Sequence, residues 1–114
     1  MSPLISHLYE EGELEAVAKT QSECFAAGVL FARTEGIVPA PEPTHALAAA
    51  VEEALRCKES GEEKVILTAL CGHGHLDLPA YDAYLSGEMS DREWTDADQA
   101  AVAEALTKLP ALSP

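Results

Sequence analysis

Apolar residues recur at helical spacing over the first long stretch of the chain. From about Glu13 to Arg33 they return every three or four positions, which predicts an amphipathic helix with one face turned to a core. Gly36 is a plausible stop, because glycine readily adopts the left-handed conformation that ends many helices. The apolar face consists of Leu14, Val17, Ala18, Cys24, Phe25, Gly28 and Phe31.

A second helical pattern runs from about His45 to Glu59. Thr44 is the expected N-cap, since its hydroxyl can accept a hydrogen bond from a free N–H of the first turn. Gly61 is the expected terminator. The apolar face of this helix consists of Leu47, Ala50, Val51, Ala54 and Leu55.

The carboxyl-terminal third predicts further helices. A short one is expected through residues 79–85, and residues 90–93 (Ser-Asp-Arg-Glu) fit a capping box. Thr95 can cap again and open a last helix from about Asp96 to Lys108. Aspartates at its start and a lysine at its end suit the helix dipole.

Two segments predict β-strands. Ile37-Val38 is short and is followed by prolines at positions 39, 41 and 43, which we expect to enforce an extended, non-helical segment. Residues 64–70 (KVILTAL) are apolar without alternation, which is typical of a strand covered on both faces.

The order of these elements is helix, strand, helix, strand, helix, helix. It predicts an α/β fold: a partial three-layer parallel sheet with flanking helices, joined by a right-handed crossover. Two strands alone rarely form a stable sheet in water. We therefore expect residues 1–114 to be one segment of a larger or partner-dependent domain.

Composition narrows the class of protein. The 114 residues are 47% hydrophobic and carry 20 acidic against 7 basic side chains, a net charge of −13. This balance argues against a nucleic-acid surface or an anionic membrane, which both need clustered cations. Three cysteines without a pairing pattern argue against a disulfide framework. With no apparent membrane span or signal peptide, we expect a cytoplasmic protein.

The densest candidate chemistry is Cys71-Gly72-His73-Gly74-His75, which follows the second strand directly. Parallel sheets bind ligands at the carboxyl ends of their strands, and glycines let a ligand approach the backbone closely. A thiolate and two imidazoles are also zinc ligands, and Cys57 or His45 would complete four. The spacing differs from that of usual structural zinc sites, and the histidines also fit ordinary loop positions.

Two carboxylates flank the proline-rich stretch. Glu35 and Glu42 lie on either side of Val38-Pro39-Ala40, and a stiff turn holds a side chain with little entropy to lose. Glu42 also precedes a helix, where the dipole favours an ionised carboxylate. A capping or solvated pair is the simpler alternative. Cys24 and Cys57 are expected to be packing residues.

These residues carry a resemblance to a known family. Residues 35–46 (EGIVPAPEPTHA) resemble the segment EGIxPAxExxHA of tryptophan synthase β chains, and residues 64–77 resemble the strand and glycine turn that follow it. Residues 8–10 and 28–36 point to the divergent second type of β chain. The resemblance covers roughly residues 3–90.

The resemblance implies a fragment of a type II fold pyridoxal-phosphate enzyme that condenses L-serine with indole to L-tryptophan. By position, Cys71 would face the pyridine nitrogen of pyridoxal phosphate. A neutral partner does not hold that nitrogen protonated, which favours replacement at the β-carbon. Gly72 and Gly74 would allow close approach to the ring, and Glu42 would be the catalytic carboxylate near the substrate.

The resemblance also implies that parts are missing. No lysine here lies in the family's Schiff-base motif, and no glycine-rich phosphate loop is present. We therefore expect the carboxyl-terminal part of a β chain, inactive alone and partnered by an upstream half if that is supplied separately. A homodimer and the tryptophan synthase α subunit are further implied partners, with no nucleic acid and no membrane. The alternative is a small non-catalytic domain that binds a metal or a partner, the metal ligands being Cys71, His73, His75 and His45.

Overall fold

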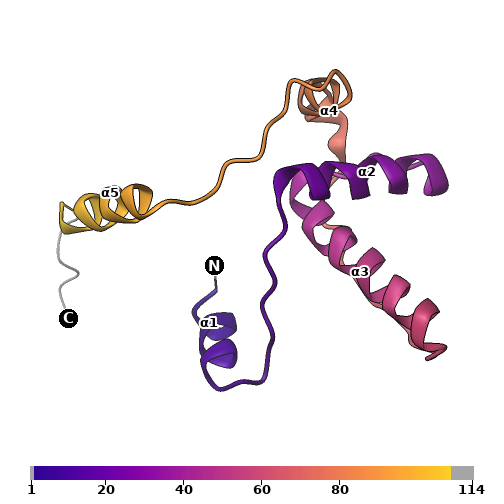
Figure 1. The fold of residues 1–114 in the computed structure, drawn as a ribbon, viewed down its shortest axis with the longest axis horizontal. Helices are drawn as coiled ribbons and strands as arrows, with labels where there is room; N and C mark the ends of the chain where they lie inside the picture. Colours follow the sequence, from indigo (N-terminus) through magenta and orange to yellow (C-terminus); the bar gives the residue numbers. More distant parts are fainter. Residues whose placement is uncertain (1, 109–114) are drawn as a thin grey trace.

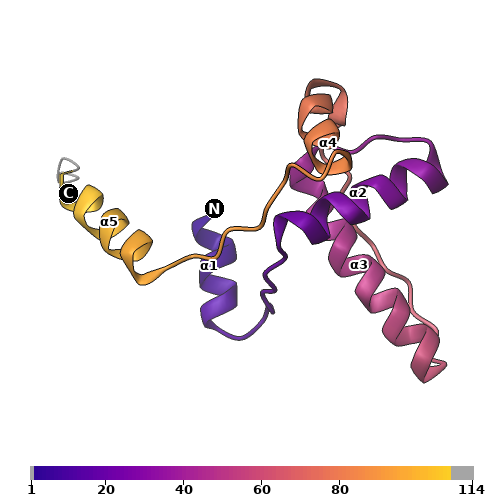
Figure 2. The ribbon, with the colours of Figure 1, turned by 45° about the horizontal axis from the view of Figure 1, so that its top comes forward.

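The computed structural model describes residues 2–108, and nearly all of their regular structure is helical (Figure 1). Helices α2, α3 and α4 lie together, whereas α1 and α5 lie apart from them at the ends of extended segments (Figures 1 and 2). No helix in this part of the chain is long and apolar enough to span a membrane. The elements are α1 (Pro3–Glu10), α2 (Gln21–Glu35), α3 (Pro41–Ser60), the single 3-10 turn η1 (Gly74–Leu76), α4 (Leu78–Leu85) and α5 (Asp96–Thr107).

Helix α2 starts later than the sequence pattern predicts. Its N-cap is Thr20, whose hydroxyl accepts from the Glu23 N–H while the Glu23 carboxylate accepts from the Thr20 N–H, a complete capping box. Leu14 and Val17, which were predicted to lie on the helix face, are exposed in the non-helical segment before it. The predicted stop is confirmed: Gly36 adopts a φ of 71° and caps the helix.

Helix α3 starts earlier than predicted, and the prolines are the reason. The N-cap is Ala40, with Pro41 at the first helical position. A helix leaves its first N–H groups without intrahelical acceptors, so Pro41 and Pro43 remove donors that the helix does not use. Thr44 is thus not the cap. It is fully buried, and its hydroxyl donates to the Pro41 carbonyl oxygen. Gly61 ends the helix as predicted.

The core lies where α2 crosses α3 and α4. Gly28 sits at the crossing, with Thr44 of α3 and Tyr81 of α4 so close that a side chain there would touch both. The Phe25 ring meets Tyr81 edge-on at 4.9 Å between centroids and stacks on Tyr84 at 5.8 Å. The buried residues of this core are Cys24, Phe25, Ala27, Gly28, Pro39, Ala40, Pro43, Thr44, Leu47, Gly74 and Tyr81.

The predicted partial parallel sheet is not formed by the described residues. The 64–70 segment is extended but pairs with no strand, and Val65 and Leu67 are 99% and 95% exposed. The expected strand at 37–38 is reduced to an isolated antiparallel bridge between Pro39 and His73. A strand needs neighbouring strands to bond its backbone, and residues 2–108 place only a helix beside the 64–70 segment.

The carboxyl-terminal predictions are mostly confirmed. Helix α4 forms as expected, and Thr95 caps α5 through a capping box with Asp98. The predicted capping box at Ser90 does not form a helix. Instead Asp91 returns to the amino end of α2, where its carboxylate accepts a hydrogen bond of 2.8 Å from the Ser22 N–H. Helix α1 was not predicted.

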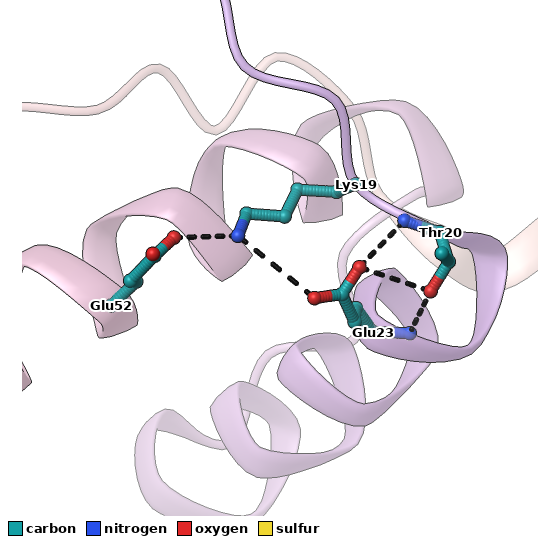
Figure 3. A network of polar contacts seen from close by, with 4 residues as sticks. All are labelled: Lys19, Thr20, Glu23 and Glu52. Carbon is teal, nitrogen blue, oxygen red and sulfur yellow. Dashed lines mark hydrogen bonds and ion pairs between the residues drawn. The ribbon is translucent and has the colours of Figure 1, made fainter.

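A polar network ties the segment before α2 to α3 (Figure 3). The Lys19 ammonium lies 2.5 Å from a Glu52 carboxylate oxygen and 3.9 Å from one of Glu23. The hydrogen bond with Lys19 lowers the pKa of Glu52, and the hydrogen bonds from Thr20 lower the pKa of Glu23. Lys19 is only 14% exposed, so its stem also covers apolar surface between the two helices.

This network predicts an acid-sensitive helix pair. The folded-state pKa of Glu52 lies below its ordinary value of 4.5. Its contribution is therefore complete above that value and is lost as pH falls through the lower, folded-state pKa. We expect the urea midpoint to fall between about pH 5 and about pH 3, and Glu52→Gln to remove part of this fall. Urea titrations followed by circular dichroism measure it.

Glu59→Gln is the matched control, because it removes the same charge from the same helix at an exposed position. If Glu52→Gln and Glu59→Gln change the acid dependence equally, the Lys19 network is not its cause.

The Gly28 crossing makes a second prediction. In an isolated helix, Gly→Ala raises stability by about 1 kcal/mol. A Cβ at Gly28, however, would lie 2.6 Å from the Tyr81 hydroxyl oxygen and 2.9 Å from Thr44 Cγ2. We expect Gly28→Ala to lower the free energy of unfolding by about 1–3 kcal/mol, measured by urea titration. The reverse change at an exposed position, Ala26→Gly, should cost about 1 kcal/mol; a stabilised Gly28→Ala chain would contradict the close crossing.

Candidate functional site

The glycine turn (residues 71–75) is held against the start of α3 by two backbone hydrogen bonds. The Ala40 N–H donates to the Gly72 carbonyl oxygen at 3.0 Å, and the Gly74 N–H donates to the Val38 carbonyl oxygen at 2.8 Å. The turn therefore lies beside the same short segment, residues 38–40, that leads into Glu42. Two motifs some thirty residues apart in sequence become one unit here.

The two glycines of the turn have a structural role in this pairing. A Cβ at Gly72 would lie 2.9 Å from the Ala40 Cβ, and one at Gly74 would collide with the Pro39 carbonyl oxygen and with Val38. The bare side of each glycine thus faces the 38–40 segment. From the sequence, these glycines were predicted to let a cofactor ring approach the backbone. In the structure, the backbone of residues 38–40 approaches them instead.

Tyr81 completes this unit, and the sequence did not single it out. Its buried hydroxyl donates a 2.7 Å hydrogen bond to the Pro39 carbonyl oxygen, between the two backbone bonds. Burial of the phenol raises the pKa of Tyr81, so it remains a neutral donor. A buried tyrosine normally needs a hydrogen-bond partner, but the identity of that partner depends on the tertiary fold.

The predicted catalytic carboxylate is accessible. Glu42 occupies the first turn of α3, and its side chain is exposed. It borders a shallow pocket of about 480 Å³. Burial raises the pKa of the Cys24 thiol in the same pocket, which keeps that group neutral. The lining residues are Gln21, Cys24, Phe25, Pro41, Glu42, His45 and Ala80.

Cys71 is an exposed free thiol on the glycine turn and does not line that pocket. No hydrogen bond joins Cys71 to Glu42 among the described residues. The structure thus places Gly72 and Gly74 against the segment that precedes α3. The side chains of Glu42 and Cys71, which were predicted to act on a ligand, are both exposed to solvent.

The histidines do not build a metal centre. His73 caps η1, its Nδ1 accepting from the His75 N–H at 3.3 Å, and the two rings lie 4.8 Å apart. Within residues 2–108 no three His, Cys, Asp or Glu side chains are placed to hold a metal ion. A local cap accounts for the His73 position, and the metal-binding alternative is not favoured.

Comparison with known proteins identifies a class of enzyme subunit: the chain is similar to part of tryptophan synthase beta chains. It is 62% identical over 90 residues to Tryptophan synthase beta chain 2 of Aquifex aeolicus, which covers 79% of this chain and 21% of that protein. The protein of the same name from Methanosarcina mazei is 60% identical over 88 residues, 77% of this chain and 20% of the relative.

Tryptophan synthase beta chain of Thermococcus onnurineus is 50% identical over 93 residues, 82% of this chain and 21% of the relative. No family model matches. The chain thus spans about one fifth of the length of the curated relatives that it matches, which fits a carboxyl-terminal fragment of such a protein.

Of the residues predicted to line a pyridoxal-phosphate site, Cys71 is the one whose side chain could meet a cofactor ring. Cys71 is an exposed free thiol on the glycine turn, and an S–H group can donate a hydrogen bond to a ring nitrogen. Two of the described lysines are held in ion pairs: Lys19 with Glu52, and Lys64 with Glu53 at 2.9 Å.

The Tyr81 hydrogen bond predicts a measurable effect on the glycine turn. We expect Tyr81→Phe to leave the buried Pro39 carbonyl without its donor and to cost about 1–3 kcal/mol of unfolding free energy. Amide exchange at Gly74 and Ala40 should accelerate by about tenfold or more, measured by mass spectrometry or NMR.

Tyr84→Phe is the control, because the Tyr84 ring also packs on Phe25 but does not bond to Pro39. Both variants keep their rings and lose only a hydroxyl, so equal acceleration would show that the Tyr81–Pro39 hydrogen bond is not what holds the turn.

Proposed function

We propose that this chain is the carboxyl-terminal part of a tryptophan-synthase-β-type protein whose complete form joins L-serine and indole into L-tryptophan. The observation that carries the proposal is the 62% identity with a tryptophan synthase beta chain over 79% of this chain. The EGIVPAPEPTHA segment, which carries the predicted carboxylate, supports it. The protein would act in the cytoplasm, in agreement with free cysteines at positions 24, 57 and 71.

In this proposal the cofactor is pyridoxal phosphate, held in the complete enzyme with Cys71, Gly72 and Gly74 along one edge. When bound, it supplies an electron sink for bond changes at the amino-acid substrate. The Cys71 thiol would be the hydrogen-bond partner of the ring nitrogen, and unlike a carboxylate it would not stabilise a protonated ring nitrogen. The Gly72–Ala40 bond keeps the turn, and hence Cys71, in place against α3.

Glu42 is the proposed catalytic carboxylate. It lies at the amino end of α3, and the Pro41 and Pro43 rings on either side restrict its backbone. A carboxylate held with little entropy to lose can accept a proton from a bound substrate and return it. Accessibility of the Glu42 side chain leaves room for a substrate to approach.

The chain by itself lacks the groups that would complete this site. The partners that we propose are therefore the upstream part of the β chain, a second β chain in a homodimer and the tryptophan synthase α subunit. We expect the isolated chain with added pyridoxal phosphate, L-serine and indole to form no tryptophan above the buffer rate, measured by liquid chromatography. Tryptophan production by the isolated chain would contradict its being an incomplete enzyme.

Complementation tests the identity itself. Co-expression with the amino-terminal part of the Aquifex aeolicus beta chain 2 should give an assembly with cofactor absorbance and tryptophan formation. A soluble, folded pair that lacks both would count against the proposal.

Site variants of the active assembly then test the roles of Glu42 and Cys71. Glu42→Gln should lower kcat by about 100-fold or more, with Glu59→Gln as the same change at an exposed position of the same helix. Cys71→Ser, which keeps a neutral donor, should retain more activity than Cys71→Ala. Full activity in Glu42→Gln would remove Glu42 from the mechanism.

A further inference from the structure

A carboxylate from the segment between α4 and α5 lies on the amino end of α2. The Asp91 carboxylate accepts a 2.8 Å hydrogen bond from the Ser22 N–H, across 69 positions of sequence. The capping box of α2 serves a different donor, the Glu23 N–H, through the Thr20 hydroxyl. Because a helix leaves its first N–H groups without intrahelical acceptors, Asp91 satisfies a donor that the local box leaves free.

The electrostatics of this contact favour a charged Asp91. The hydrogen bond from the Ser22 N–H is the largest of the effects that lower the pKa of Asp91 below its ordinary value. A carboxylate at this place also meets the positive end of the helix dipole, and a hydrogen bond to a charged acceptor is stronger than a neutral one. At neutral pH the contact therefore holds the chain around Asp91 against α2.

The segment that carries this anchor begins directly at the end of α4. Gly87 adopts a φ of 74°, which turns the chain away from the helix, and its N–H donates to the Tyr84 carbonyl oxygen. Only residues 86–90 separate α4 from Asp91, and Met89 among them is half-buried. Figures 1 and 2 show the chain passing the amino end of α2 on its way from α4 to α5. Asp91 thus ties the carboxyl end of α4 to the amino end of α2.

Helix α4 connects this anchor with the glycine turn. Its Tyr81 hydroxyl donates to the Pro39 carbonyl oxygen, beside the two backbone hydrogen bonds that hold the turn. Both Tyr81 and Tyr84 of α4 pack against the Phe25 ring of α2. A displacement of α4 relative to α2 would therefore change the hydrogen bond to Pro39, and with it the support of the turn.

The pocket that Glu42 borders is bounded by the same two helices. Gln21 directly precedes Ser22 in the first turn of α2, and Ala80 lies on α4. Asp91 is not among the lining residues. It joins α2 and α4 outside the pocket, and so restricts the separation of two of the pocket walls.

We infer that Asp91 is a positioning residue of the proposed site: by tying the end of α4 to the start of α2, it holds the Tyr81 hydrogen bond, the glycine turn and the Glu42 pocket in one arrangement. The effect on the reaction rests on the proposed function, whereas the effect on the turn rests on the described contacts alone. Asp91 acts through α4 and not by contact with a ligand, since it does not line the pocket.

Amide exchange of the isolated chain, measured by NMR, tests this role. In Asp91→Ala the Ser22 amide, which donates to the anchor, should exchange faster by about fivefold or more. The amides of Ala40 and Gly74, which make the backbone bonds of the glycine turn, should accelerate by a similar factor. Asp91→Asn keeps an acceptor oxygen and should stay within about twofold of the unmodified chain. Far-ultraviolet circular dichroism checks that each variant is folded.

Glu93→Ala is the matched control, because it removes the same charge from an exposed position of the same segment. A pair of shortened chains separates the anchor from α5. The chain that ends after Ser90 should show the exchange of Asp91→Ala, whereas the chain that ends after Trp94 should show that of the unmodified chain.

The single tryptophan of the chain gives a second measurement. Trp94 is 67% exposed and follows Asp91 closely in sequence, so its fluorescence anisotropy reports the mobility of the anchored segment. The anisotropy should fall in Asp91→Ala and be retained in Asp91→Asn. An unchanged anisotropy in Asp91→Ala would show that Asp91 does not anchor the segment, and would overturn the inference.

The assembly with the amino-terminal part of the Aquifex aeolicus beta chain 2 tests the effect on the reaction. Asp91→Ala should lower kcat by about fivefold or more, and Asp91→Asn should restore most of it. Unchanged exchange at Ala40 and Gly74, equal acceleration in Glu93→Ala, or an unchanged kcat in Asp91→Ala would overturn the inference. If the unmodified assembly forms no tryptophan, the proposed reaction fails, and the exchange and anisotropy results alone decide the role of Asp91.

Discussion

The Tyr81 hydrogen bond to the Pro39 carbonyl is the interaction on which the described structure depends most. It joins α4 to the segment that enters α3, at the point where the backbone of that segment pairs with the glycine turn. The same tyrosine closes over Gly28 of α2. Three helices and the turn thus meet around one buried hydroxyl. Glu42 lies two residues after Ala40, and Cys71 directly precedes Gly72, so both side chains are attached to the backbone that this interaction holds.

Glycine and proline make this meeting possible for different physical reasons. Prolines at the start of α3 lose no hydrogen bond and restrict the backbone next to Glu42. Gly72 and Gly74 let two backbones approach within hydrogen-bond distance, and Gly28 lets two helices and a tyrosine share one crossing. These glycines and prolines, which carry no reactive group, therefore determine where the Glu42 and Cys71 side chains lie.

Outside this core, many large apolar side chains of the described residues are exposed to solvent. A small core surrounds Phe25 and Tyr81, while an apolar extended segment lies open beside α3. A large exposed apolar surface on a soluble chain usually marks an interaction surface. The chain spans about one fifth of the length of the tryptophan synthase beta chains to which it is similar. Among the described residues, the 64–70 segment is extended but has no neighbouring strand.

The sequence by itself determined the local structure and the family resemblance. Glycines after α2 and α3, the Thr95 cap and the extended form of residues 64–70 follow from short-range conformational preferences, which act without a partner. The tertiary structure decided what those elements touch. It placed Thr44 in the core instead of at a cap, and it turned the bare sides of Gly72 and Gly74 toward Val38–Ala40. The Thr20 cap of α2, in contrast, is a local Thr-x-x-Glu signal that the apolar periodicity before it obscured. The side-chain pattern shows which surfaces are apolar, whereas the contact that buries each surface depends on residues distant in the chain.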